Sequence, residues 1–171
     1  MGALATSPQT HLSLRSATQA ALEKSDNTAL NVIKYYSEPR LGEEEQSLSY
    51  LKLKPVQEDG LSYINAKSYV GILSCLYESC YNTPADSQEM LDYLSQSHFP
   101  GIADGVPSSV QVAHKIGTAM ETHDDCGIVY LPLRPYILCV MVNQPRQTYA
   151  KTMKDVSAIV YGEVVAAHTT K

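Results

Sequence analysis

The spacing of apolar residues changes near residue 110, and this change most constrains the fold. Before that point, apolar side chains recur every three or four residues, which is the spacing of a helix face. After it come three short runs rich in β-forming residues, separated by brief polar connections. Short connections join antiparallel strands. The sequence therefore predicts an α+β fold of one domain, mainly helical over 12–109, with the sheet strands and a terminal helix over 110–168.

Helix boundaries can be expected where capping residues precede an apolar stripe. Ser13 is a candidate N-cap for a helix that ends at Glu23, and Asn65 is a candidate N-cap for a longer helix that ends at Cys80. A helix over 28–36 is expected to stop at Ser37-Glu38-Pro39, because the residue before proline disfavours helical geometry. Further helices are expected over about 87–94 and 147–168.

The three expected strands cover 110–117, 126–131 and 136–142. His123-Asp124-Asp125 reads as the turn between the first two strands, and 132–135 as the turn between the last two. The terminal helix is expected to cover the sheet with an apolar face. That face consists of Met153, Val156, Ile159, Val160 and Val164.

Composition limits the classes of partner. The chain has 171 residues, 44% of them hydrophobic, and a net charge of -5 without a cluster of Lys or Arg. Nucleic acids and anionic membranes require a concentrated basic surface, so neither is expected. No apolar run is long enough for a membrane span, and the first residues show no export signal. Small molecules and proteins are the expected partners.

The four cysteines do not form a metal-binding pattern. Cys75, Cys80, Cys126 and Cys139 include no Cys-x-x-Cys pair and have no histidine at ligand spacing, so no zinc site is expected. Cys75 and Cys139 fall in apolar segments and read as small buried hydrophobic residues. Whether any of the four form a disulfide stays open at this stage.

Two short motifs carry candidate chemistry. Ser25-Asp26-Asn27 joins two helical segments, and these residue types serve either as a helix cap or as polar groups of an active site. Far downstream, Lys115 lies on the first expected strand, and Gly117 would let a substrate backbone approach the strand edge. Each motif is weak alone, but together, in this order and on these elements, they favour an active site.

These motifs resemble those of penicillin-interacting serine hydrolases, the group of class A β-lactamases and penicillin-binding proteins. That group is marked by Ser-x-x-Lys, Ser-Asp-Asn and Lys-Thr-Gly. The resemblance covers most of 12–168, including "INAKSYVGILSCLYE" over 64–78, "GVPSSVQVAHKIG" over 105–117 and "DDCGIVYLPLRPYILCVMV" over 124–142. It implies a β-lactamase-like fold, serine acyl-enzyme chemistry on β-lactams or peptidoglycan-type peptides, and no metal or organic cofactor.

The resemblance also implies roles for individual residues. Ser25 would relay a proton, and Asn27 would bind the substrate amide and the family's catalytic lysine, while Asp26 holds the turn. Lys115 would place positive charge beside Ser25 and the substrate carboxylate. Gly117 and Thr118 would line the strand edge, with the Thr118 amide as a donor of the oxyanion hole.

The chain departs from the family pattern at two places. Ile116 replaces the Thr of Lys-Thr-Gly, which removes a hydroxyl that would bind the substrate carboxylate. No Ser-x-x-Lys precedes Ser25; the motif at 49–52 follows it and is attributed to chance, and Glu38 comes too early to belong to the family's deacylation loop. The chain is therefore interpreted as the C-terminal portion of a serine hydrolase, inactive alone.

The sequence leaves two functional hypotheses. In the first, the nucleophile is supplied by an upstream segment or by another chain, such as a second copy. The unpaired sheet edge and the apolar helix faces would receive that segment. In the alternative, the chain is a non-catalytic domain that binds peptidoglycan or a protein. The family resemblance places the parent protein in the cell envelope.

Overall fold

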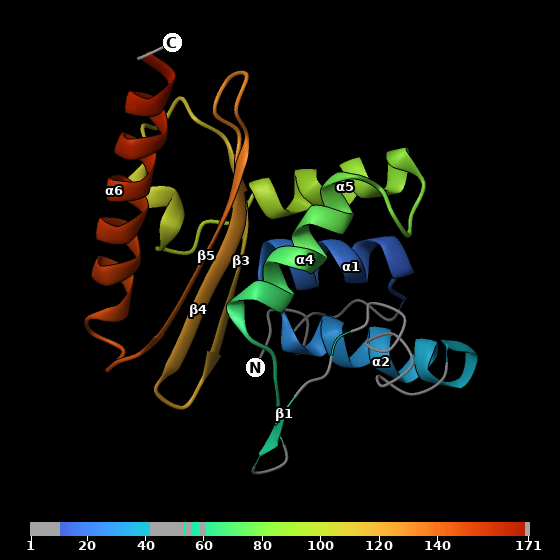
Figure 1. Ribbon diagram of the computed structural model, residues 1–171. Helices are drawn as coiled ribbons and strands as arrows, with labels where there is room; N and C mark the ends of the chain where they lie inside the picture. Colours follow the sequence, from blue (N-terminus) through green and yellow to red (C-terminus); the bar gives the residue numbers. More distant parts are fainter. Residues whose placement is uncertain (1–10, 42–52, 54–55, 59–60, 170–171) are drawn as a thin grey trace.

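The computed structural model describes residues 11–41, 53, 56–58 and 61–169. A three-stranded antiparallel sheet lies between two layers of helix, with α6 (Tyr149–Thr169) on one side. The other side is covered by helices α1 (Leu14–Glu23), α2 (Asn27–Leu41), α4 (Ala66–Tyr77) and α5 (Pro84–Ser95), as Figure 1 shows. The predicted α+β class is confirmed.

Side-chain caps begin several of these helices. Ser13 Oγ accepts from the Ser16 amide at 3.1 Å, and Asn65 Oδ1 accepts from the Ser68 amide at 2.9 Å. Both predicted caps are therefore confirmed. The expected end of the second helix is wrong, because α2 continues to Leu41. Pro39 falls in its last turn, where the missing amide removes a single donor close to the natural end of the helix.

The sheet has the order β3-β4-β5, formed by Val112–Ala119, Thr122–Val129 and Tyr136–Asn143. A separate hairpin pairs β1 (Val56–Glu58) with β2 (Leu61–Tyr63). The predicted turn at His123-Asp124-Asp125 is wrong, since all three residues belong to β4. The chain reverses at Met120 and Glu121 instead, and Met120 has a φ of 57°. Within the sheet, Asp125 contacts His114 and the Ile102 amide, and His123 contacts Thr118.

Two apolar clusters hold the layers together, one on each face of the sheet. Leu73, Leu91 and Leu94 of the helical layer pack against Ala113 and Ile128 on one face. On the other face, η2 (Ile102–Gly105) and α6 pack against the strands around the buried Ile102, Val112, Val129, Val140 and Met153. Alternate residues of β3 therefore face different layers.

The terminal helix covers the sheet as predicted, with one error in its inward face. Met153 is fully buried and Val156 packs in the second cluster, whereas Ile159 is 66% exposed. Ile159 falls outside the stripe that 153, 156 and 160 form at helical spacing. Ser157 lies inside that stripe, fully buried, and its hydroxyl donates to the Ile102 carbonyl at 2.7 Å.

Each of the two outer strands has one edge without a strand partner in the described part of the chain. Within the described residues, β3 and β5 each pair with β4 alone, so both leave one edge unpaired. Just before β4 and just after β5, the Glu121 carbonyl accepts from the Gln144 amide. This bond determines which residues of β5 direct their backbone groups toward β4. Backbone groups of 137, 139, 141 and 143 consequently point to the open edge of β5.

Candidate functional site

The Ser-Asp-Asn stretch forms the connection between α1 and α2, and its residues divide the two roles considered for it. Asp26 is 3% exposed, and its Oδ1 accepts from the amides of Thr28 at 2.8 Å and Ala29 at 3.0 Å. Asp26 therefore caps α2. Ser25 precedes it in a left-handed backbone conformation, with a φ of 51°. This conformation leaves the Ser25 hydroxyl available for a partner outside the helix.

That partner is Lys115 of β3. Its Nζ donates to Ser25 Oγ at 2.6 Å, although the two residues are 90 positions apart. Lys115 Nζ also donates to the Ile116 carbonyl at 2.7 Å, which orients the ammonium along the strand edge. A helix connection and an edge strand thus meet in one polar contact, and the two sequence motifs lie at a single place.

The backbone of β3 presents alternate residues to the open edge. The Gln111 carbonyl accepts from the Tyr130 amide at 2.9 Å, so 113, 115 and 117 bond to β4 in the same register. The amides and carbonyls of Ile116 and Thr118 therefore point away from β4. The bond from Lys115 Nζ to the Ile116 carbonyl agrees with this direction. An extended ligand can pair with this edge through main-chain hydrogen bonds.

Burial and neighbouring carboxylates act in opposite directions on Lys115. Burial lowers the pKa of the Lys115 ammonium, and the charges of Asp124 and Asp125 partly oppose this by favouring the protonated form. A lysine held in this way is a proton donor more easily deprotonated than a lysine in water. The site is therefore suited to moving protons through the Ser25 hydroxyl.

Asp124 is a site residue that sequence reasoning missed. A Cβ atom on Gly117 would lie 2.4 Å and 2.7 Å from the two carboxylate oxygens of Asp124, so that carboxylate covers Gly117 on the Lys115 face. Burial raises the pKa of Asp124, and the charge of Lys115 counteracts part of this effect. A side chain at position 117 would therefore have to displace the Asp124 carboxylate, and Gly117 leaves room both for that carboxylate and for a substrate.

Tyr69 completes the polar surroundings on this face. It projects from α4 and packs against the first apolar cluster. Burial is the main cause of the raised pKa of its phenol, and the charges of Asp124 and Asp125 add to it. The Tyr69 hydroxyl therefore stays protonated throughout the physiological range.

The sequence holds a signal for Asp124. A pattern of alternating strand residues at 122–128 would have placed Asp124 beside Lys115, but the interpretation of 123–125 as a turn obscured that pattern.

The remaining predicted residues lie near this contact but differ in orientation. Asn27 is exposed, and no hydrogen bond between described residues joins its side chain to Ser25 or Lys115. β3 runs regularly through Gly117, so Thr118 shares a face with Ile116. The Thr118 hydroxyl lies 3.2 Å from Nδ1 of the buried His123, on the α6 side. The Thr118 amide, rather than its hydroxyl, faces the open edge.

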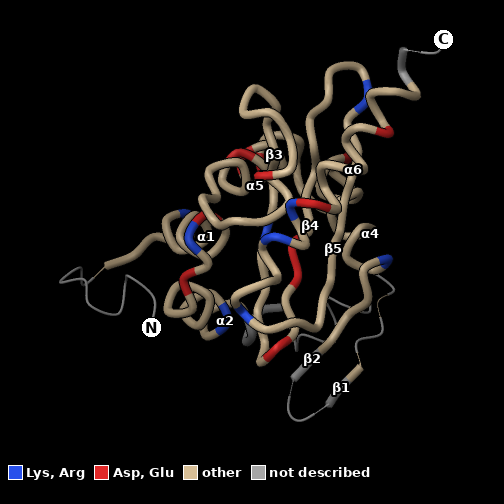
Figure 2. Tube along the Cα trace, turned by 90° about the vertical axis from the view of Figure 1, so that its left-hand side faces the viewer, with Lys and Arg blue, Asp and Glu red and all other residues tan. Residues whose placement is uncertain are grey.

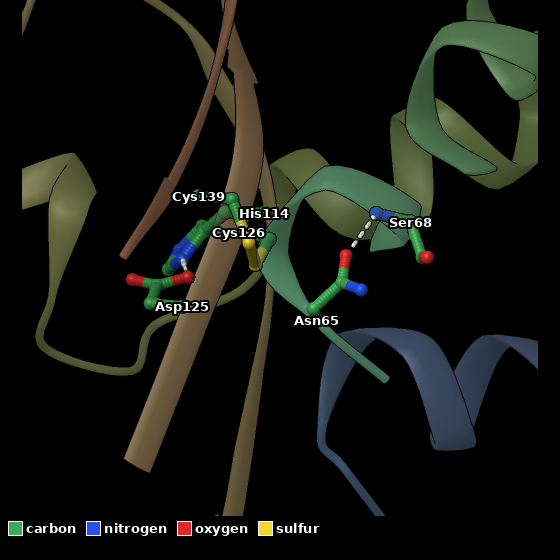
Figure 3. Close-up of a disulfide and its surroundings, with 6 residues drawn as sticks. All are labelled: Asn65, Ser68, His114, Asp125, Cys126 and Cys139. Atoms are coloured by element: carbon green, nitrogen blue, oxygen red, sulfur yellow. Dashed lines mark hydrogen bonds and ion pairs between the residues drawn. A yellow bond between two sulfur atoms is a disulfide. The ribbon is translucent and has the colours of Figure 1, made fainter. Parts of the chain in front are cut away.

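Behind the site, a buried pair connects the same strands to η2. His114 Nδ1 lies 2.8 Å from Asp125 Oδ1, and Asp125 Oδ2 accepts from the Ile102 amide at 2.8 Å. His114 is 1% exposed and Asp125 is fully buried. Figure 3 shows this pair beside a disulfide that joins β4 to β5.

That disulfide links Cys126 to Cys139, which settles one question that the sequence left open. Cys139 is therefore half of a bridge rather than a free buried thiol. Cys75 is partly buried and Cys80 is exposed, and neither forms a disulfide. Within the described ranges, no three His, Cys, Asp or Glu side chains gather closely enough to hold a metal ion.

The distribution of charge and the hydrophobicity of the helices can be described for these residues. Figure 2 shows acidic and basic residues interspersed along the chain rather than gathered by sign. In the part of the chain that the structure describes, no helix is both long and apolar enough to cross a membrane. The motif at 49–52 lies outside the described residues. Glu38 lies within the last turns of α2.

Known proteins relate to the chain through sequence family and fold. A model of the "Beta-lactamase enzyme family" matches residues 1–164. The fold is similar to that of PBP-A, with a TM-score of 0.82 and 20% identity over 95% of this chain and 65% of that one. A putative class A β-lactamase from Rhodopseudomonas palustris gives a TM-score of 0.75 and 20% identity, covering 91% of this chain and 67% of that one.

A PBP-A variant in an acyl-enzyme complex with penicillin G is also similar, with a TM-score of 0.80 and 19% identity. The match covers 94% of this chain and 65% of the PBP-A variant. No curated protein matches the sequence significantly. The chain thus spans about two thirds of the length of these structural relatives.

Proposed function

Because the chain belongs to the beta-lactamase enzyme family, we propose that it supplies the proton-relay and substrate-edge half of a serine acyl-transfer site. The observation that carries this proposal is the 2.6 Å hydrogen bond from Lys115 Nζ to Ser25 Oγ. It joins the two motifs at the edge of β3 that has no strand partner among the described residues. The substrates are β-lactams or peptidoglycan-type peptides.

In this proposal, a Ser-x-x-Lys segment supplies the nucleophile, and that segment lies either upstream or on another chain. Its serine attacks the substrate carbonyl and forms an ester, while the departing nitrogen requires a proton. Ser25 gives its hydroxyl proton to that nitrogen and receives the proton that left the nucleophile. Lys115 holds the Ser25 oxygen and stabilises the negative charge that develops on it during the transfer.

The edge of β3 positions the substrate. The Thr118 amide donates to the developing oxyanion, and Gly117 lets the acyl group lie close to the strand. Asn27 binds the substrate amide from the opposite side, from an exposed position two residues after Ser25. Lys115 attracts the substrate carboxylate, but the nearby Asp124 weakens that attraction. Weak binding of anionic substrates is the expected consequence.

The length difference from the structural relatives supports a missing nucleophile segment. The chain covers 65% of PBP-A, and the backbone groups on one side of β5 have no strand partner among the described residues. A segment that pairs with β5 would extend the sheet and cover this edge. A second copy of the chain is the other candidate for this edge. The proposed setting is the cell envelope, where peptidoglycan-type substrates occur.

A non-catalytic role in binding peptidoglycan or a protein is the second candidate, and Ile116 favours it. Position 116 holds isoleucine where the family has threonine, so it offers no hydroxyl to a substrate carboxylate. Ile116 lies opposite Asp125 in the strand register. Binding through the open edge of β3 would not require the nucleophile. Such a domain would bind a D-Ala-D-Ala peptide and never form an ester.

Intact-mass spectrometry after incubation with penicillin separates the two functions. The chain is measured alone, with a Ser-x-x-Lys segment added, and with the same segment carrying Ser→Ala. A penicillin adduct that requires the intact segment supports acyl transfer, and Lys115→Ala in this chain should slow its formation. Peptide binding without any adduct supports the second candidate. An adduct on the chain alone contradicts the assigned roles and points to Ser49.

A further inference from the structure

The C-terminal end of α4 brings two free cysteines together. The Cys80 amide donates to the Cys75 carbonyl at 2.9 Å, and the Ser79 amide donates to the Leu76 carbonyl at 3.3 Å. Ser79 has a φ of 57°, in the left-handed region. These three features define a Schellman motif, with Cys75 at its third-last helical position and Cys80 two residues beyond the cap. Those two positions are the pair whose side chains contact each other in this motif.

The arrangement suits a reversible covalent bond. Cys75 is partly buried and Cys80 is exposed, so a dissolved oxidant reaches Cys80 first. The hydrogen bond from the Cys80 amide to the Cys75 carbonyl keeps the two backbones close together, as a disulfide requires. A hydrogen bond with the Cys75 side chain is also the main cause that raises the pKa of the Cys80 thiol. The buried Cys126–Cys139 bridge is separate from this pair.

We propose that Cys75 and Cys80 are a redox-sensitive dithiol that closes to a second disulfide and fixes the turn between α4 and α5. The inference does not depend on the acyl-transfer function. α4 packs on β4 and β5, and α5 packs on β3, so the turn connects two helices that cover the site-bearing face of the sheet. A closed disulfide would restrict unwinding of the last turn of α4.

The reaction is a thiol–disulfide exchange with an oxidised low-molecular-weight disulfide such as oxidised glutathione. The Cys80 thiolate attacks one sulfur of that disulfide, which forms a mixed disulfide and releases one glutathione thiolate. The Cys75 thiolate then attacks the Cys80 sulfur and releases the second. Two protein thiols lose two protons and two electrons, and one glutathione disulfide becomes two thiols. Because the pKa of Cys80 is raised, the first step should accelerate as pH increases.

The test is mass spectrometry of the native chain after treatment with oxidised glutathione. The protein is then alkylated, denatured without reduction and cleaved after Glu78, which lies between the two cysteines. The expected result is a pair of peptides that stay joined until a reductant is added, with no alkyl group or glutathione on Cys75 or Cys80. The oxidised chain should also have a higher Tm than the Cys75→Ser/Cys80→Ser variant, in which Cys126–Cys139 remains.

A matched control keeps the number of thiols and moves one of them. The Cys75→Ser/Lys67→Cys variant places the thiol at an exposed position in the first turn of α4, at the opposite end of the helix from Cys80. It should keep glutathione on Cys80 many times longer than the wild-type chain does. Equal lifetimes of the two adducts, or alkylation of both wild-type thiols after treatment, would overturn the proposal. Circular dichroism of each variant establishes that it is folded.

Discussion

The two faces of β3 and β4 carry charged side chains in contrasting environments. On the α6 face, the buried His114–Asp125 pair also satisfies the Ile102 amide, which ties the strands to η2. On the helical face, Lys115 has a hydroxyl and a carbonyl as partners, at an open strand edge. The first arrangement satisfies buried charge and supports the fold. The second leaves a partly buried cation with spare donor capacity, which is the property that a proton relay needs.

The largest expected effect comes from breaking the α6-face pair. Asp125→Ala removes the acceptor for both His114 and the Ile102 amide, and leaves two buried donors without a partner. We expect the free energy of unfolding to fall by about 3–5 kcal/mol, measured by urea denaturation. Asp125→Asn should lose less, because it retains an acceptor for Ile102. A loss equal to that of an exposed substitution, such as Asp155→Ala, would contradict a structural role for this pair.

Lys115→Ala tests the other face. The change should reduce the rate of penicillin acylation by roughly 10²–10³-fold when a nucleophile segment is present, the size reported for loss of one electrostatic group. Its effect on the free energy of unfolding should be small, since the desolvation cost of the ammonium disappears with it. Quenched-reaction assays of acylation give the rate, and urea denaturation of the same variant gives the free energy of unfolding. Strong destabilisation with unchanged acylation would reverse the contrast between the faces.

The Ser-Asp-Asn connection allows a comparison between neighbouring residues. Asp26→Ala should lower the free energy of unfolding by about 1 kcal/mol, through loss of the cap on α2. Asn27→Ala should cost less, because Asn27 is exposed and Asp26 supplies the cap. Ligand affinity should respond in the opposite order. If Asn27→Ala changes neither binding of a D-Ala-D-Ala peptide nor acylation, Asn27 has no functional role.

The smallest expected change is electrostatic. Asp124→Asn removes a charge that favours protonated Lys115, so the pKa of Lys115 should fall further below its usual value. The pH dependence of any step that needs the ammonium would move to lower pH. Titration of the Lys115 side chain by NMR measures this shift, with Asp155→Asn as a distant control. An unchanged pKa of Lys115 would show that Asp124 does not act on it.

The sequence predicts the Lys115–Ser25 contact better than it predicts the surroundings. Local signals are sufficient for Ser13 and Asn65, because a cap acts within its own first turn. Local signals fail for His123, Asp124 and Asp125, because these residue types are typical of turns. Their actual partners lie on β3 and η2, which a local pattern does not reveal. The Cys126–Cys139 bridge requires the β4-β5 register, which spacing alone does not establish. Long-range contacts thus define the site beyond its two motifs.

Direct observation of Lys115 tests the central claim that Lys115 and Ser25 form one partly buried proton relay. The side-chain nitrogen of Lys115 is assigned by NMR with the Lys115→Arg variant and titrated alongside the exposed Lys151. The account predicts that Lys115 titrates at lower pH than Lys151, because burial lowers its pKa. It also predicts that Ser25→Ala changes the Lys115 titration and leaves that of Lys151 unaltered. Identical titration of the two lysines, unaffected by Ser25→Ala, would contradict the relay.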